Sequence, residues 1–266
     1  MGALRCGGFV NDAIWWDAKP ILATDKGAIK IFDGDAEVAT LGSHAGAAKG
    51  LALHPSGDIL ASLGVDKSYM LYDLTSMKLL TQIFTDSGTA LSSNFPLPNV
   101  TLANTRRPEL TCGAFHPDGH LFAAGSTDGR IRLFDAKSGA QAAVFDNNPT
   151  SPTTSLSFSE NGIWLAAASR TDPVAIWDLR KATVVQSFDV GAAVDGVAWD
   201  YTGQFLALVG AGGISVQAYV KASKSWSEPL RRGEPAVAVA WGPGARSLAV
   251  LNADGSVSVM GEAGRE

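Results

Sequence analysis

The stretch "FHPDGHLFAAGSTDGRIRLFD", residues 115–135, contains two short apolar segments, each followed or preceded by a polar turn. Phe115 precedes the turn "HPDG", and a second apolar residue, Phe122, follows seven positions after Phe115. An Asp-Gly pair, which favours a hairpin, then precedes residues 130–134, where polar and apolar side chains alternate. Such alternation is typical of a half-buried strand. The stretch therefore predicts consecutive antiparallel strands joined by tight turns.

The same pattern recurs along the chain. The first apolar residue of each copy is Trp15, Leu53, Phe115, Phe158, Trp199 or Trp241. The residue seven positions later is Leu22, Leu60, Phe122, Leu165, Leu206 or Leu248. Most copies start about 41 residues apart, and repeats of about this length with four short strands each are typical of propeller blades. We therefore expect an all-β propeller with six recognisable four-stranded blades.

The repeats also place the expected boundaries of one propeller domain, residues 9–266. The expected blades are residues 9–43, 44–84, 108–147, 150–189, 191–230 and 233–262. One interval between repeats carries about 20 surplus residues, and residues 85–109, which include them, have three prolines and no sustained periodicity. We expect residues 85–107 to form an inserted, mobile surface loop.

Composition limits the classes of function. The chain has 266 residues, 46% of them hydrophobic, with a formal net charge of -5, so it does not resemble a nucleic-acid coat protein. Its two cysteines, Cys6 and Cys112, are too few for a disulfide framework and favour a reducing compartment. We expect no signal peptide and no membrane span.

The ends of the repeats carry a family resemblance. The tripeptides "IFD" (31–33), "LYD" (71–73), "LFD" (133–135) and "IWD" (176–178) resemble the Trp-Asp ending of WD-repeat propellers. Only Trp177 and Asp178 form the literal dipeptide, and Phe32, Tyr72 and Phe134 occupy the aromatic position elsewhere.

Residues 110–135 and 157–181 are similar to the fourth and fifth repeats of the pre-mRNA-processing factor nineteen family, the U-box ubiquitin ligases of the spliceosome. The resemblance covers residues 10–262. It implies a nuclear scaffold in pre-mRNA splicing, with a possible part in the DNA-damage response. The implied partners are splicing-complex proteins and ubiquitination substrates, and contact with RNA is also possible.

The chain departs from this family in two respects. It contains neither the U-box, through which the family transfers ubiquitin, nor the coiled coil through which the family forms tetramers. The family has seven blades, and the first is expected to be the one missing here. We therefore expect this chain to be monomeric and without catalytic residues of its own. Whether six blades close into a ring, and which face binds a partner, stays open.

The resemblance also implies a hydrogen-bonded network inside a blade, in which a turn aspartate joins a histidine, a hydroxyl and the aromatic residue. His44, Ser62, Asp66 and Tyr72 fit it in the second repeat, although Tyr72 lacks the indole donor of tryptophan. In the fourth repeat Thr171 stands where the aspartate is expected. The other residues expected to support blades are Asp128, Phe134, Trp177, Asp178 and Asp254.

No motif predicts a catalytic, cofactor-binding or metal site. His54 and His116 occupy a turn position that holds Ser159, Asp200 or Gly242 in other repeats, so a structural role is favoured. The aspartates recur on different blades, and this spacing disfavours metal ligation.

Basic and aromatic side chains supply candidates for partner binding, because tryptophan and arginine are common interface anchors. The candidates are Arg106, Arg107, Arg130, Arg170, Trp164 and Trp226. The alternative to a splicing scaffold is a generic WD-repeat adaptor subunit of another intracellular complex. An enzyme with a ligand in a central channel is disfavoured, since the expected inner strands are mostly small and apolar.

Overall fold

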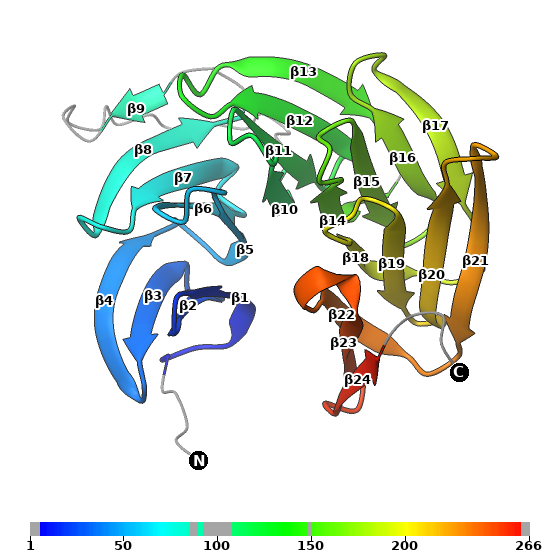
Figure 1. The fold of residues 1–266 in the computed structure, drawn as a ribbon. Coiled ribbons are helices and arrows are strands. Elements are labelled where there is room, and N and C mark those ends of the chain that lie inside the picture. Colours follow the sequence, from blue (N-terminus) through cyan, green and yellow to red (C-terminus); the bar gives the residue numbers. More distant parts are fainter. Residues whose placement is uncertain (1–5, 86–89, 93–107, 148–150, 262–266) are drawn as a thin grey trace. The chain divides into compact units, whose positions relative to one another are not determined.

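The computed structural model describes residues 6–85, 90–92, 108–147 and 151–261. In this part the chain forms 24 strands and one short 3-10 turn, η1 (Pro243–Ala245), and the strands make six antiparallel sheets (Figure 1). The sheets follow one another along the sequence, and within each sheet the strands lie in sequence order. The expected all-β propeller fold with six blades is confirmed.

The chain divides into two compact units, residues 1–144 and 145–266, with the boundary inside β13. In the first unit, one sheet contains β1 (Val10–Trp16), β2 (Lys19–Thr24), β3 (Ala28–Asp33) and β4 (Ala36–Ser43). The next contains β5 (Ala48–Leu53), β6 (Ile59–Gly64), β7 (Ser68–Asp73), β8 (Lys78–Phe84) and β9 (Ala90–Ser92). The third contains β10 (Leu110–Phe115), β11 (Leu121–Ser126), β12 (Arg130–Asp135) and β13 (Gln141–Asp146).

The second unit contains the remaining three sheets. The first is β14 (Thr153–Phe158), β15 (Trp164–Ser169), β16 (Val174–Asp178) and β17 (Thr183–Phe188). The second is β18 (Val194–Trp199), β19 (Phe205–Gly210), β20 (Gly213–Val220) and β21 (Ser225–Arg232). The last has three described strands, β22 (Ala236–Trp241), β23 (Ser247–Asn252) and β24 (Val257–Gly261).

Each sheet begins with the same irregularity. The pairing between the first and second strands shifts after the first paired residue of the first strand, as a β-bulge does. Five positions after that residue lies the first apolar residue of the repeat. The six sheets are therefore copies of one unit, and the bulge gives a common register in which positions can be compared.

The second strand of most sheets is covered on both faces. Four of these strands, β6, β11, β15 and β19, share one pattern, in which only the first residue keeps partial exposure. Alanine is frequent in them, for example at Ala123, Ala124 and Ala167. Small side chains fit here because the neighbouring sheets of a propeller pack against each face.

The first repeat differs from its expected alignment. Trp15 pairs with Pro20, whereas the equivalent Trp199 pairs with Leu206 and Trp241 with Leu248. The prediction that Leu22 occupies this second position was wrong. The turn between β1 and β2 is shorter than its counterparts, so the partner of Trp15 lies two residues earlier.

Part of the expected loop at residues 85–107 is a strand. Residues 90–92 form β9, which pairs antiparallel with β8 as a fifth strand of its sheet. A single short strand with little alternation gives no periodic signal in the sequence, so the loop expectation was wrong for these residues. Residues 86–89 and 93–107 lie outside the described part of the chain.

Candidate functional site

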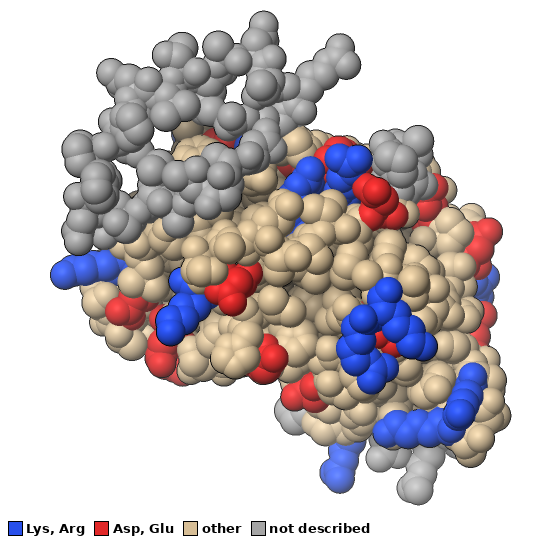
Figure 2. Space-filling model, turned by 90° about the horizontal axis from the view of Figure 1, so that it is seen from above, with Lys and Arg blue, Asp and Glu red and all other residues tan. Residues whose placement is uncertain are grey.

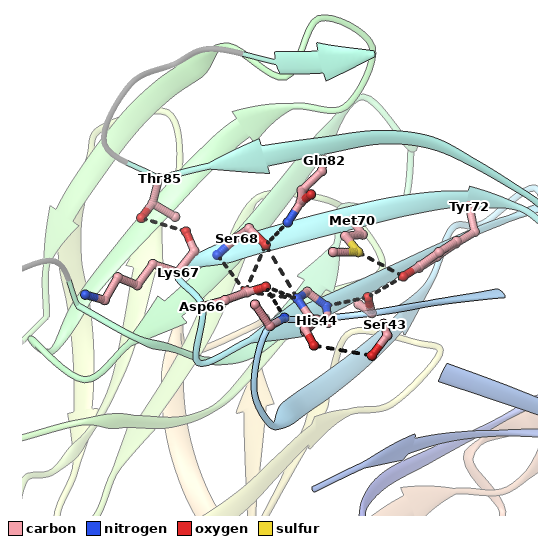
Figure 3. A network of polar contacts seen from close by, with 11 residues as sticks. Ser43, His44, Asp66, Lys67, Ser68, Met70, Tyr72, Gln82 and Thr85 are labelled. Carbon is pink, nitrogen blue, oxygen red and sulfur yellow. Dashed lines mark hydrogen bonds and ion pairs between the residues drawn. The ribbon is translucent and has the colours of Figure 1, made fainter. Parts of the chain in front are cut away.

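The most extensive polar cluster in the first unit surrounds His44, at the start of the second sheet (Figure 3). His44 Nδ1 lies 3.0 Å from Asp66 Oδ1, and His44 Nε2 lies 2.8 Å from the Ser62 hydroxyl. Ser62 Oγ also lies 3.4 Å from the Tyr72 hydroxyl, which donates to Met70 Sδ at 3.1 Å. The structure thus brings together all four residues that the sequence placed in this network, and the phenol of Tyr72 joins it despite lacking an indole donor.

Further donors hold the Asp66 carboxylate. It accepts hydrogen bonds from the Ala45 backbone N–H at 3.0 Å and from the Ser68 hydroxyl at 2.9 Å. Ser68 in turn accepts one from Gln82 at 2.9 Å. Sequence analysis missed Ser68 and Gln82, since the family pattern contains neither. Their positions in the sequence could have indicated them, because both lie on strands next to the turn that carries Asp66.

Burial and hydrogen bonding act in opposite directions on Asp66. Desolvation by burial raises the pKa of its carboxyl, but hydrogen bonds from His44, Ala45 and Ser68 lower it by more, so the pKa lies below its usual value. For Tyr72, burial dominates and raises the pKa of the phenol to about 12. The aspartate is therefore ionised and the phenol neutral at neutral pH.

Ser62, His44 and Asp66 make the same pairwise contacts as the Ser-His-Asp triad of hydrolases. Their burial excludes that chemistry in this fold. Ser62 is 0% exposed and His44 is 3% exposed, so no substrate carbonyl reaches the hydroxyl. The arrangement holds the segment that joins β4 and β5 to the β6–β7 turn, and it is a structural network.

In the third sheet the equivalent turn aspartate, Asp128, is held by an arginine of the same sheet, Arg132. The buried Arg132 makes two hydrogen bonds to Asp128, with its two terminal nitrogens at 3.2 and 2.8 Å, and donates to Ser126 Oγ at 2.6 Å. Burial raises the pKa of the Asp128 carboxyl, but the hydrogen bonds from Arg132 and Ser126 leave it below its usual value. Sequence analysis assigned no structural role to Arg132. The sequence feature that was missed is that Arg132 lies on the same face of β12 as the buried Phe134, two residues later.

In the fourth sheet the turn aspartate is shifted by one residue. Thr171 stands at the expected position, but Asp172 accepts a hydrogen bond from Ser169 Oγ at 3.0 Å. The Asp172 backbone N–H in turn donates a hydrogen bond to Ser169 Oγ at 3.1 Å. The aspartate that the sequence comparison found missing is therefore supplied by the next residue.

The aromatic positions near the ends of the third strands are buried. Phe134 is 1% exposed and packs 5.0 Å from the ring of Tyr69. Trp177 stacks on Phe145 at 4.9 Å and donates its indole N–H to Asn147 at 3.0 Å. Each of these two side chains contacts a ring on the preceding sheet.

Asp178 and Asp254 cap turns. Asp178 accepts hydrogen bonds from the backbone N–H groups of Arg180 and Lys181, at 2.9 and 3.2 Å. The side-chain hydrogen bond from Arg180 holds the pKa of Asp178 below its usual value. Asp254 is exposed and accepts from both the backbone and the hydroxyl of Ser256. Asp254 is thus a turn residue without a buried network.

The basic candidates are spread over separate places. Arg130 is exposed at the start of β12, and Arg170 is an exposed side chain whose Nε lies 3.4 Å from Asp195. Arg106 and Arg107 lie outside the described residues. In Figure 2, basic and acidic side chains form small interspersed groups on the visible face. The described cations therefore supply individual contact points and no continuous basic track on that face.

Trp164 and Trp226, the aromatic candidates for partner binding, lie together, and their role in binding stays a prediction. Each is partly buried in an aromatic cluster with Trp199 and Tyr219. Trp164 lies 5.9 Å from both Trp199 and Trp226, measured between ring centroids. The two tryptophans come from β15 and β21, which sequence spacing alone does not place together. Their main contacts are with the blades of this chain.

Two features are absent from the described part of the chain. No group of three or more histidine, cysteine, aspartate or glutamate side chains in this part of the chain is placed to hold a metal ion. No helix within the described ranges is long and apolar enough to cross a membrane.

Comparison with known proteins agrees with this geometry. The model of the WD40 family (WD domain, G-beta repeat) matches residues 100–135. A solved structure, the β-propeller domain of Cps50 (Swd1) from Myceliophteria thermophila, has a TM-score of 0.78 at 14% sequence identity. That match covers 98% of this chain and 85% of the solved chain, and supports the fold alone.

Sequence relatives are more specific. Pre-mRNA-processing factor 19 homolog 2 from Arabidopsis thaliana is 30% identical over 232 residues, which is 85% of this chain and 40% of the relative. Pre-mRNA-processing factor 19 from Schizosaccharomyces pombe is 34% identical over 177 residues, 66% of this chain and 31% of the relative. This chain is a WD-repeat propeller related to pre-mRNA-processing factor 19. It spans less than half the length of these curated relatives.

Replacing His44 tests the network. We expect His44→Ala to lower the free energy of unfolding by about 2–4 kcal/mol, since Asp66 and Ser62 lose a buried partner. Urea titration measures the change. His120→Ala, at an exposed histidine of the same unit, is the matched control and should stay within about 0.5 kcal/mol of the unsubstituted protein. Equal losses in the two variants would contradict the structural role of the network.

The lowered pKa of Asp66 predicts a pH dependence. Its carboxylate stabilises the folded chain above the unfolded pKa of about 3.9, and this stabilisation is lost as pH falls through the lower folded pKa. The unsubstituted protein should therefore exceed Asp66→Asn in melting temperature at pH 7, and the difference should shrink below about pH 4. Thermal unfolding between pH 7 and pH 3 measures it, and a difference that stays constant would refute the ionic role of Asp66.

Proposed function

We propose that this chain is a protein-interaction scaffold that acts in pre-mRNA splicing. The observation that carries the proposal is the similarity to pre-mRNA-processing factor 19, which extends over 85% of the chain in the plant relative. A propeller suits a scaffold because rigid sheets support many exposed loops, and binding residues concentrate on loops. The polar clusters of the described blades are occupied with structural contacts, so the binding surface lies elsewhere on the blades.

A more specific proposal concerns ubiquitin transfer. The family that the sequence resembles transfers ubiquitin through a U-box, and a propeller in such a ligase would recruit substrates and splicing proteins. We propose that the chain has this recruiting role and that it acts in the nucleus. We further propose that it takes part in the DNA-damage response. The support is family similarity alone.

Protein partners fit the surface better than RNA. The whole chain has a formal net charge of -5, and the described arginines are paired or interspersed with acids, as with Arg170 and Asp195. Binding to a phosphate backbone depends on several cations acting together. Arg170, which is 70% exposed at its side chain, is the described basic candidate best suited to contact an acidic protein surface.

Affinity purification tests the proposal. The 266-residue chain, immobilised and incubated with nuclear extract, should retain spliceosome proteins above the level held by an unrelated WD-repeat propeller. Mass spectrometry of the bound fraction measures the enrichment. Treatment of the extract with RNase should leave it intact, and its loss would instead indicate a bridge through RNA.

Two results would contradict the proposal. Equal recovery of splicing proteins on both propellers would remove the support for a splicing role. Specific enrichment of an unrelated complex would favour the alternative of a generic WD-repeat adaptor. Arg170→Glu should reduce the specific enrichment, whereas Lys221→Glu, at another exposed cation of the second unit, serves as the matched control.

A further inference from the structure

The outer edge of the fourth sheet lacks the features that usually protect an exposed strand. β17 is the last strand of this sheet, and no other strand of the described chain pairs with its outer edge (Figure 1). Charged side chains and prolines on an edge strand usually prevent it from pairing with another chain. The outer strands β4, β8, β13 and β21 each contain a charged residue, and β21 also contains a proline. β17, with the sequence TVVQSF, contains neither.

The second sheet shows that such an edge can take another strand in this fold. Its outer strand, β8, pairs antiparallel with β9 through residues 81–83. β8 and β17 carry the same bulge, in which Leu80 or Val185 is passed over in the pairing with the third strand. Residues 186–188 of β17 are therefore the equivalents of the residues that pair with β9. In the described part of the fourth sheet they have no such partner strand.

The charges beside β17 have opposite signs at its two ends. Lys181 lies in the turn before the strand, Asp189 directly follows the strand, and both side chains are exposed. Neither side chain is in an ion pair with another described residue. Each lies four positions from Val185. In an antiparallel pair of β17 strands that places the two Val185 residues opposite each other, Lys181 of each copy therefore stands opposite Asp189 of the other.

We propose that β17 pairs antiparallel with β17 of a second copy of this chain. The uncharged residues 182–188 form the new ladder, and an ion pair between Lys181 and Asp189 closes each end of it. Because both copies use the same surface, the interface is isologous and closes as a dimer. All of these residues belong to the second compact unit. The dimer differs from the monomer that the sequence led us to expect, and it does not depend on the proposed splicing role.

Reversing one charge at a time tests the pairing. Lys181→Glu and Asp189→Lys each place like charges at both ends of the ladder, because the interface is symmetric. Sedimentation velocity of the 266-residue chain should show a monomer at low concentration that becomes a dimer as the concentration rises. Each single variant should weaken this association at least about tenfold, since like charges in contact across an interface are costly.

An equimolar mixture of the two single variants should associate again, because each introduced charge then faces its opposite in the mixed dimer. The double variant Lys181→Glu/Asp189→Lys should also associate about as well as the unsubstituted chain. An unsubstituted chain that stays monomeric at every concentration would overturn the proposal. So would a mixture that associates no better than either single variant while circular dichroism shows both variants folded.

Val185→Lys tests the centre of the ladder, and Val220→Lys is its matched control. Both valines are exposed, by 44% and 41%, and Val220 lies at the end of β20 in the neighbouring sheet, so the fold should tolerate either change. Val185→Lys places two lysines together at the two-fold axis and should keep the chain monomeric, whereas Val220→Lys should leave the dimer unchanged. Equal association of these two variants would contradict the pairing of β17.

Discussion

The packing of one sheet's apolar face against the next is the interaction on which the other features depend. A four-stranded sheet of this size cannot bury its own apolar faces. When the faces of two sheets pack together, both are removed from water. This requirement explains the small residues of the second strands and the single large residue at the end of each first strand. In the second unit, Trp199 and Trp241 each fill the space between two sheets in this way.

The polar clusters between the packed sheets differ from one sheet to the next. The second, third and fourth sheets each hold a turn aspartate, but its partner is His44 in one, Arg132 in another and Ser169 in the third. The partners differ in charge and length while the turn stays the same. The constraint is therefore that a carboxylate at least partly withdrawn from water must be hydrogen-bonded, and no particular partner is required. This also explains why a Ser-His-Asp arrangement occurs here without catalytic access.

The repeat made most of the fold readable from sequence. Apolar spacing and Asp-Gly turns predicted the blades, and the family pattern predicted four residues of the His44 network but not Ser68 or Gln82. The failures have physical causes. Trp164 and Trp226 lie on strands that are distant in sequence. Arg132 is buried beside Ser126 and Asp128 of its own sheet, and β9 is too short for a periodic signal.

Hydrogen exchange followed by mass spectrometry tests most directly whether packing between sheets carries the stability. The account predicts the slowest amide exchange in β6, β11, β15 and β19, the strands buried on both faces, and faster exchange in the outer strands β4 and β17. Outer strands that exchange as slowly as these four would contradict it, since backbone pairing alone would then account for the protection.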